Sequence, residues 1–410
     1  MADTLEDTRF IRTLRPKNLL SFGPDSPPIE LGALNVLIGP NGSGKSNVIE
    51  AVDLLRATAT DLVAPVRAGG GTEEWLWKGA DIHPRAELEA ILAYPDGIMP
   101  LRHKITFTTL RQRFELIDEV VENEDRSSPS EKDVFFFYRY QEGRPVLSVR
   151  EIDDKETAYS SGRRERNLRR EDLAPDQSVL SQRRDPDQYP EITYLGGKYR
   201  QFKLYREWNM GRNTAPRNPQ PVDQPNDFLA EDASNLGLVL NSLERTGSVK
   251  DSLDSHFSKF YDQYRDYSAS IEGGTVQLFL RENSLGHAVP ATRLSDGTLR
   301  FMCLASVLCH PSPPPLMCIE EPEIGLHPDI LPLVAEMLTE ASQRTQIVVT
   351  THSDILVAAL TLIPEAVLVC EKESNATSVR RLDPDRLREW LEDYTLGDLW
   401  LSGELGGNRW

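Results

Sequence analysis

The segment Gly39–Ser46, which reads GPNGSGKS, constrains this 410-residue chain more than any other feature. It matches the pattern G-x-x-x-x-G-K-[ST] at every required position. An apolar stretch precedes it at residues 34–38, and apolar residues then recur at helical spacing over residues 48–59. The glycines let backbone N–H groups converge on phosphate oxygens, and the start of the helix adds a partial positive charge. We expect Lys45 to reach the β- and γ-phosphates of ATP and Ser46 to ligate Mg²⁺. The residues expected to bind ATP in this loop are Gly39, Pro40, Asn41, Gly42, Ser43, Gly44, Lys45 and Ser46.

Two carboxylates follow an apolar stretch later in the chain. Residues 316–319 read as a buried strand, and Glu320 and Glu321 come directly after them. Because successive side chains of a strand point in opposite directions, the two glutamates should have different tasks. We expect Glu320 to hold Mg²⁺ and Glu321 to orient and deprotonate the attacking water, as the catalytic base. Taken alone, the pair is equally compatible with a solvated turn.

A second helix start with anion-binding character lies between these two motifs. Ser295 and Gly297 stand just before a predicted helix, where they offer a hydroxyl and an unobstructed backbone. An ordinary helix cap would look the same. One subunit already has such a helix start in its phosphate loop, so we expect this one to contact the γ-phosphate bound by a second copy.

A histidine ends the strand predicted at residues 346–351. His352 can donate a hydrogen bond to the γ-phosphate and respond to its loss, so we place it in the catalytic group. A surface histidine is the plainer alternative. Four motifs in the correct order favour the nucleotide site.

The four motifs together resemble those of ABC ATPases. Gly39–Ser46, Leu294–Gly297, Ile319–Glu321 and Thr351–His352 are similar to the Walker A, signature, Walker B and switch-histidine motifs. The resemblance implies an α/β fold: an ABC-type ATPase head with a parallel-sheet core, an antiparallel β subdomain and a helical lobe. It also implies ATP and Mg²⁺ as cofactors and a homodimer with ATP between the subunits.

The run Glu321–Pro328 narrows this resemblance. It is similar to a segment of RecF-like ATPases and of the ATPase halves of OLD-family nucleases. On that resemblance, Gly325 and His327 would lie at the dimer interface with Ser295. Glu320 departs from the family, in which Asp is frequent at this position. Residues 396–407 look like the tail of bacterial RecF-like ATPases that are associated with defence operons.

The resemblance also implies a glutamine that joins the two lobes and contacts Mg²⁺. We assign this role to Gln182, because a helical region follows it. Gln141 is the competing choice, although it reads better as a turn residue.

Composition and periodicity predict the organisation of the rest of the chain. Residues 1–150 should hold the phosphate loop and an antiparallel meander, whose strands start near residues 86, 101, 114 and 134. Residues 151–270 should form a polar insertion and a helical lobe, with helix over 227–267. Residues 271–410 should return to the ATPase lobe, because helices and apolar strands alternate there as in a parallel sheet.

The net charge of −18 argues against attraction of the whole surface to nucleic acid or to an anionic membrane. DNA binding is possible only through a local basic patch, and the arginines of residues 163–184 are the candidate. A solvated loop with balanced charges is the alternative. The chain shows no membrane-spanning stretch and no signal peptide at its acidic start, so we expect a cytoplasmic protein without a membrane partner.

The 58 residues after His352 are fewer than the roughly 100 of a nuclease domain, so we expect none in this chain. The leading hypothesis is an ATP-dependent dimerisation switch for antiviral defence or DNA repair. It would form dimers or higher oligomers and control a separate effector such as a nuclease. A subunit that energises a membrane transporter is the second hypothesis, and a scaffold with structural nucleotide is the third.

Overall fold

The computed structural model describes residues 8–79, 85–126, 133–141, 144–150, 163–169 and 173–407. The chain forms two compact units, and both are discontinuous in sequence. Unit 1 comprises Met1–Gly32, Gly39–Phe202 and Cys370–Arg380, and unit 2 comprises Ala33–Ile38, Lys203–Val369 and Arg381–Trp410. These boundaries differ from the expected regions 1–150, 151–270 and 271–410, because distant segments complete the packing of each unit.

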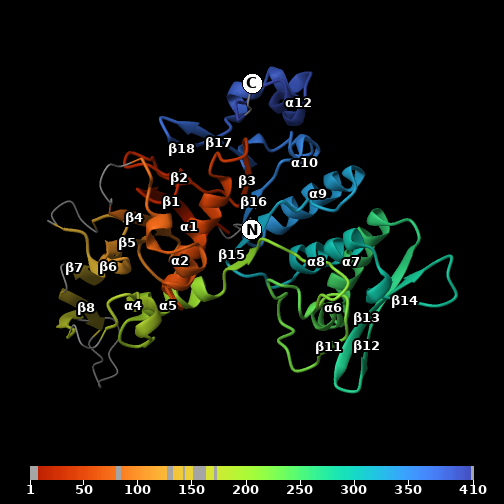
Figure 1. The fold of residues 1–410 in the computed structure, drawn as a ribbon, viewed down its shortest axis with the longest axis horizontal. Coiled ribbons are helices and arrows are strands. Elements are labelled where there is room, and N and C mark those ends of the chain that lie inside the picture. Colours follow the sequence, from red (N-terminus) through yellow and green to blue (C-terminus); the bar gives the residue numbers. More distant parts are fainter. Residues whose placement is uncertain are drawn as a thin grey trace, which may run out of the picture. The chain divides into compact units, whose positions relative to one another are not determined.

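An antiparallel sheet organises unit 1 (Figure 1). Its strand order is β2-β1-β4-β5-β6-β7-β8-β9. The meander predicted from turn signals is therefore confirmed, and one further strand from the polar region after residue 150 extends it. The strands are β1 (Ile11–Lys17), β2 (Ile29–Glu30), β4 (Ala86–Leu92), β5 (Leu101–Leu110), β6 (Arg113–Asn123), β7 (Phe136–Gln141), β8 (Arg144–Arg150) and β9 (Arg163–Asn167).

The helix after the phosphate loop is α1, and it buries the predicted face. Val48, Ile49, Val52 and Leu55 are all inaccessible to solvent, so the period of the apolar residues identified the packed side correctly. The helices of unit 1 are α1 (Lys45–Thr58), α2 (Ala64–Ala68), α3 (Thr72–Trp75), α4 (Val179–Gln182) and α5 (Pro190–Arg200).

Parallel strands form the core of unit 2, in the order β10-β15-β16-β3-β17. Every residue of β3 and β16 is buried, as expected for central strands covered by helices on both faces. The strands are β10 (Lys203–Tyr205), β15 (Leu316–Glu320), β16 (Gln346–Thr350), β3 (Leu34–Ile38) and β17 (Val367–Glu373), and β18 (Ala376–Arg381) follows β17 in the chain. The helices between them are α8 (Asp296–Leu308), α9 (Leu331–Ser342) and α10 (Asp354–Ala358). The predicted alternation of helices and strands is confirmed.

The helical lobe of unit 2 combines two helices with a small antiparallel sheet. The expected helix over 227–267 is wrong at both ends, because residues 227–235 are not helical and Tyr264 already pairs with Glu282 in a hairpin that turns at Gly273-Gly274. Figure 1 shows this hairpin beside α6 and α7. The elements are α6 (Leu236–Glu244), α7 (Gly247–Phe260), β11 (Gln220–Pro221), β12 (Tyr264–Glu272), β13 (Thr275–Glu282) and β14 (Val289–Pro290).

Short helices complete unit 2: the α-helices α11 (Pro384–Leu387) and α12 (Leu396–Leu401), and the 3₁₀ helices η2 (Ala291–Arg293), η3 (Pro328–Ile330), η4 (Pro364–Ala366) and η5 (Trp390–Glu392). Across the described parts of the chain, we find no helix with the length and apolar character needed to cross a bilayer.

Candidate nucleotide site

The phosphate loop begins with a close approach between two backbone segments of unit 1. Gly39 has φ of +144°, and a Cβ at this position would lie 2.2 Å from the carbonyl oxygen of Cys370. Only glycine can occupy this position without moving the backbone. Burial raises the pKa of the adjacent Cys370 thiol to about 12, so it remains a neutral packing residue.

The side chain of Lys45 folds back onto the phosphate loop. Its Nζ donates to the carbonyl oxygens of Gly39 at 2.8 Å and Pro40 at 3.2 Å. Gly44 is the N-cap of α1 and has φ of +101°, and as a glycine it has no side chain with which to cap the first N–H groups. Ser46 follows in the first turn and is exposed. This half of the site matches a phosphate cradle.

A hydroxyl cluster supports the phosphate loop, and no pattern in the sequence indicated it. Thr377 of β18 is 3% exposed. Its Oγ1 donates to the carbonyl oxygen of Ser43 at 2.8 Å and lies 2.6 Å from the Ser21 hydroxyl, from which it can accept a hydrogen bond. Asn47 in turn donates to Ser21 Oγ at 2.7 Å. Three segments far apart in sequence therefore fix one carbonyl of the loop.

Gln182 lies at the end of α4 in unit 1, the unit that also contains the phosphate loop. Its Oε1 accepts from the N–H of Ala174 at 2.6 Å, and its Nε2 donates to the carbonyl of Gln177 at 3.0 Å. The side chain is therefore bonded to its own loop, and its role at Mg²⁺ stays a prediction. The competing Gln141 ends β7.

Buried polar contacts attach the segment before Gln182 to the sheet. Ser178, the N-cap of α4, donates to the Glu119 carboxylate, which also accepts from Val179 N at 2.9 Å. His103 Nε2 lies 3.3 Å from Glu119 Oε1. The polar side chains of Ser178, Glu119 and His103 are all inaccessible to solvent. Such a satisfied network specifies one position for α4.

The segment before α4 is also bonded to the chain just beyond α1. Gln177 Nε2 donates to Asp61 Oδ1 at 2.7 Å, and Leu62 N donates to Gln177 Oε1 at 3.0 Å. The hydrogen bond from Gln177 lowers the pKa of Asp61 below its usual value. The chain that follows α1 and the segment that leads into α4 are thus directly bonded.

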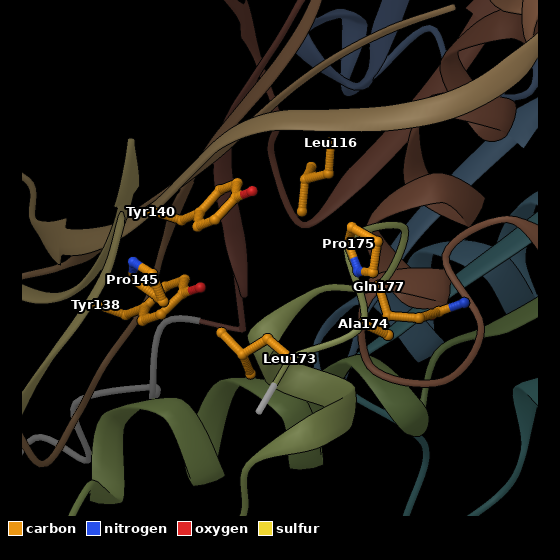
Figure 2. A pocket seen from close by; sticks show the side chains of 8 residues that line it. All are labelled: Leu116, Tyr138, Tyr140, Pro145, Leu173, Ala174, Pro175 and Gln177. Carbon is orange, nitrogen blue, oxygen red and sulfur yellow. The ribbon is translucent and has the colours of Figure 1, made fainter. Parts of the chain in front are cut away.

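A hollow lies beside this segment in unit 1. It is lined on one side by the rings of Tyr138 and Tyr140 and on the other by Pro175 and Gln177 (Figure 2). The Gln177 amide points away from the tyrosines, consistent with its bond to Asp61. The lining is mostly apolar, and the hollow contains none of the predicted nucleotide-binding residues.

The predicted acidic residues and His352 lie in unit 2. β15 ends at Glu320, and Glu321 adopts φ of +46°, a conformation that costs a residue with a side chain about 1–3 kcal/mol. The N–H of Glu321 donates to the carbonyl of Thr350 at 2.9 Å. The turn, rather than strand alternation, therefore separates the two carboxylates. His352 Nε2 lies 3.9 Å from Glu321 Oε1, so the structure brings the two predicted catalytic residues together.

Glu320 forms an ion pair that the sequence did not predict. Arg206, in the segment after β10, places Nε 3.5 Å from Glu320 Oε1. The carboxylate of Glu320 and the exposed hydroxyl of Ser46 are hard oxygen donors, which is the chemistry that Mg²⁺ prefers. The predicted ligands suit that ion.

Glu323 positions the segment that carries His352. Its Oε1 accepts from Thr351 Oγ1 at 2.7 Å and from the backbone N–H of His352 at 2.7 Å. We did not single out Glu323 in the sequence, although its two-residue spacing from Glu321 placed it in the same motif. One carboxylate thus links the turn after β15 to the turn after β16.

The signature residues start α8, as predicted. Ser295 is the N-cap, and its Oγ accepts from Thr298 N at 3.0 Å while lying 2.7 Å from Thr298 Oγ1. A Cβ at Gly297 would lie 2.7 Å from the carbonyl oxygen of Gly325, so the signature loop packs directly on the segment that follows Glu321. His327 is exposed on the same segment, with its ring 3.4 Å from Asp329. The roles of Gly325 and His327 in a dimer stay predictions.

The arginine-rich segment is partly structural. Arg163 starts β9, and its guanidinium bonds Glu191 at 2.5 Å and lies over the ring of Phe137. Arg150 bonds the same carboxylate at 3.1 Å. Arg163 is therefore committed to packing, and residues 170–172 of this segment lie outside the described residues.

Two solved structures and one curated protein are similar to this chain. A solved structure of an SMC head, described as bound to the C-winged helix domain of ScpA, is similar over 93% of this chain and all of its own chain, at 14% identity and a TM-score of 0.57. A second, from Pyrococcus furiosus, is an SMC head with an extended coiled coil; it covers 94% of this chain and 99% of its own, at 15% identity and a TM-score of 0.49. The chromosome partition protein Smc of Desulfitobacterium hafniense is 32% identical over 114 residues, which is 27% of this chain and 9% of that protein.

The fold and the order of the motifs define a P-loop ATPase with an SMC-like, ABC-type head. Residues 34–358 match the family described as "AAA domain, putative AbiEii toxin, Type IV TA system", and the chain belongs to that family. The narrower resemblance to RecF and OLD proteins rests on the residues of the motifs alone.

Proposed function

We propose that this protein is an ATP-dependent dimerisation switch that hydrolyses ATP with Mg²⁺. Two copies bind two ATP molecules between them. Each triphosphate contacts Gly39–Ser46 of one copy and Ser295 and Gly297 of the other. Gly325 and His327 lie at the same interface.

The observation that carries the proposal is the start of α8. It has the N–H groups and the hydroxyl of an anion site, and Ser295 is exposed while Leu294 just before it is buried. In addition to the start of α1, the chain therefore has a second exposed helix start with groups suited to a phosphate. We propose that the start of α1 binds the copy's own nucleotide and that the start of α8 binds the nucleotide of the partner.

Hydrolysis uses the pair at the end of β15 and β16. Glu321 accepts a proton from the attacking water, the water oxygen bonds to the γ-phosphorus, and the bond to the leaving oxygen of ADP breaks. His352 donates a hydrogen bond to the γ-phosphate. Ser46, Glu320 and Gln182 are the residues that would hold Mg²⁺, and the ion would supply positive charge to offset that of the β- and γ-phosphates.

We further propose that the dimer controls a separate effector in defence or repair. Two findings support this. The family description names a toxin of a type IV toxin–antitoxin system, and the SMC head of similar fold was solved with a bound ScpA domain. A nuclease is the effector class that we favour, with DNA as a further candidate partner.

The variant Glu321→Gln tests the switch. The neutral amide cannot accept the proton, so hydrolysis should fall by about 10²- to 10⁴-fold while ATP still binds. Light scattering after gel filtration should then show stable dimers with ATP and monomers without it. Glu389→Gln, at an exposed position, is the matched control. Monomers alone, at saturating ATP and Mg²⁺, would contradict the proposal.

A further inference from the structure

An arginine of the Pro- and Asn-rich loop is buried behind the signature residues. Arg217 is 6% exposed, although its loop, at residues 211–226, is mostly polar. A buried guanidinium is costly unless its N–H groups are bonded, so its partners indicate what it is for.

All three nitrogens of the Arg217 guanidinium are bonded. Nε donates to the carbonyl of Met210 at 2.7 Å. Nη1 donates to the carbonyl of Leu294 at 2.6 Å and to that of Ala291 at 3.4 Å. Nη2 donates to the Asp296 carboxylate. Arg217 therefore holds the backbone just before Ser295 and the side chain just after it.

The rigid fork of arginine suits this task better than a lysine would. Several N–H groups in one plane bond acceptors that surround a single loop, which fixes orientation as well as distance. Asp296 is 72% exposed in its side chain, so the ion pair contributes less than the buried carbonyl bonds. The geometry of the loop depends chiefly on the bonds to Leu294 and Ala291.

A second contact joins the same segment to α8. Arg300, one turn into α8, donates from Nη2 to the carbonyl of Trp208 at 3.1 Å, and its guanidinium lies 6.0 Å from the centre of that ring. Burial lowers the pKa of Arg300 from its usual value. Residues 208–217 are thus bonded both to the loop before α8 and to α8 itself.

We infer that Arg217 is a positioning residue that holds Ser295 and Gly297 in the conformation in which they contact the nucleotide of a second copy. This inference rests on the proposed dimer. Ser295 itself is exposed, and its Oγ bonds the start of its own helix. On its N-terminal side, Arg217 bonds the carbonyls of Leu294 and Ala291, two residues whose side chains are buried.

The test places Arg217→Met in the Glu321→Gln protein, with Arg217→Lys as the conservative variant. Methionine fills the space but has no N–H groups. Binding of a fluorescent ATP analogue to the monomer should stay within about twofold of the parent, because the phosphate loop is in unit 1. The dimer dissociation constant with ATP, measured by analytical ultracentrifugation, should rise about tenfold or more, since bonds to a charged group are lost. Arg217→Lys should restore part of the lost dimer affinity.

The control is Arg293→Met, which removes an exposed arginine from the segment just before α8. This variant should leave dimerisation unchanged.

Hydrogen exchange of the Arg217→Met monomer gives a readout that does not need the dimer. Amides of residues 295–299 should exchange faster than in the parent, with unit 1 unchanged. Parental exchange in these amides overturns the inference, and so does parental dimer affinity. If Glu321→Gln alone stays monomeric with ATP, the proposed function fails, while the exchange data still decide the role of Arg217.

Discussion

The starts of α1 and α8 have similar chemistry but are held in place differently. At α1, Gly44 is the N-cap and Lys45 bonds the carbonyls of its own loop. At α8, Ser295 caps the helix, and the loop around it is held by Arg217, which precedes it by almost eighty residues. The first depends chiefly on its own segment, with Thr377 as a weaker distant support, and the second depends also on a buried arginine far away in the sequence. We therefore expect local substitutions to have the largest effects at the phosphate loop, and both local and distant substitutions to affect the signature loop.

The largest expected effect is that of Lys45→Ala. Each charge-assisted bond to a phosphate contributes about 1.5–3 kcal/mol, so ATP affinity should fall by roughly ten- to a hundredfold or more. Titration calorimetry measures this directly. Lys78→Ala, an exposed lysine of unit 1, should bind like the parent. Unchanged ATP affinity of Lys45→Ala would show that Lys45 does not contact the triphosphate.

The next largest effect is expected at Gly297, where the signature loop meets another backbone. A Cβ would lie 2.7 Å from the carbonyl oxygen of Gly325, so Gly297→Ala should destabilise the nucleotide-free monomer by about 1–3 kcal/mol through overpacking. Urea unfolding measures the change. Gly286→Ala is the matched control, because a Cβ there meets nothing within 4 Å. Equal stability of the two variants would show that the backbone at Gly325 moves aside from Gly297 at little cost in free energy.

Glu323→Ala examines a link within unit 2. The variant loses the acceptor for Thr351 Oγ1 and for the N–H of His352. His352 should then be misplaced, and the turnover number should fall about tenfold while ATP binding persists. A steady-state phosphate-release assay separates the two parameters. Glu336→Ala, which removes an exposed partner of Lys259, serves as the control; a parental turnover number for Glu323→Ala would mean that His352 positions itself.

The smallest effect should come from Thr377→Val. This variant keeps the shape but removes the hydroxyl that bonds the Ser43 carbonyl and Ser21. The loss of one or two neutral hydrogen bonds costs about 0.5–1.5 kcal/mol each, so ATP should bind a few-fold more weakly. Thr292→Val, at an exposed position, should not change the affinity. A loss as large as that of Lys45→Ala would mean that the phosphate loop also depends on distant segments.

The parts of the fold that the sequence predicted are those with local determinants. Apolar period identified the buried face of α1, and turn residues identified the strands of the meander. The phosphate loop could be recognised because its glycines are required by backbone conformation within a few residues. Glu321 and His352 each follow a predicted strand, and in the structure His352 Nε2 lies 3.9 Å from Glu321 Oε1.

The parts that could not be predicted depend on contacts between segments far apart in the chain. Nothing in residues 211–226 marks Arg217 as buried, since its partners lie beyond residue 290. Thr377 likewise resembles any strand threonine until β18 reaches the phosphate loop. The helical pattern of the preceding residues continues through Tyr264, which predicts helix there. In the structure Tyr264 belongs to a strand, and its partner Glu282 lies beyond the following turn. Long-range pairing decided each of these cases.

The hydroxyl of Thr377 has a consequence for how the chain is made. A ribosome releases the N-terminal residues first, at roughly 5–20 residues per second. Residues Gly39–Ser46 therefore emerge long before the segment Cys370–Arg380 that completes unit 1. During that interval, the nascent protein contains the glycine-rich loop without its last support. Nucleotide that binds during this interval should accordingly be held a few-fold more weakly than in the finished chain.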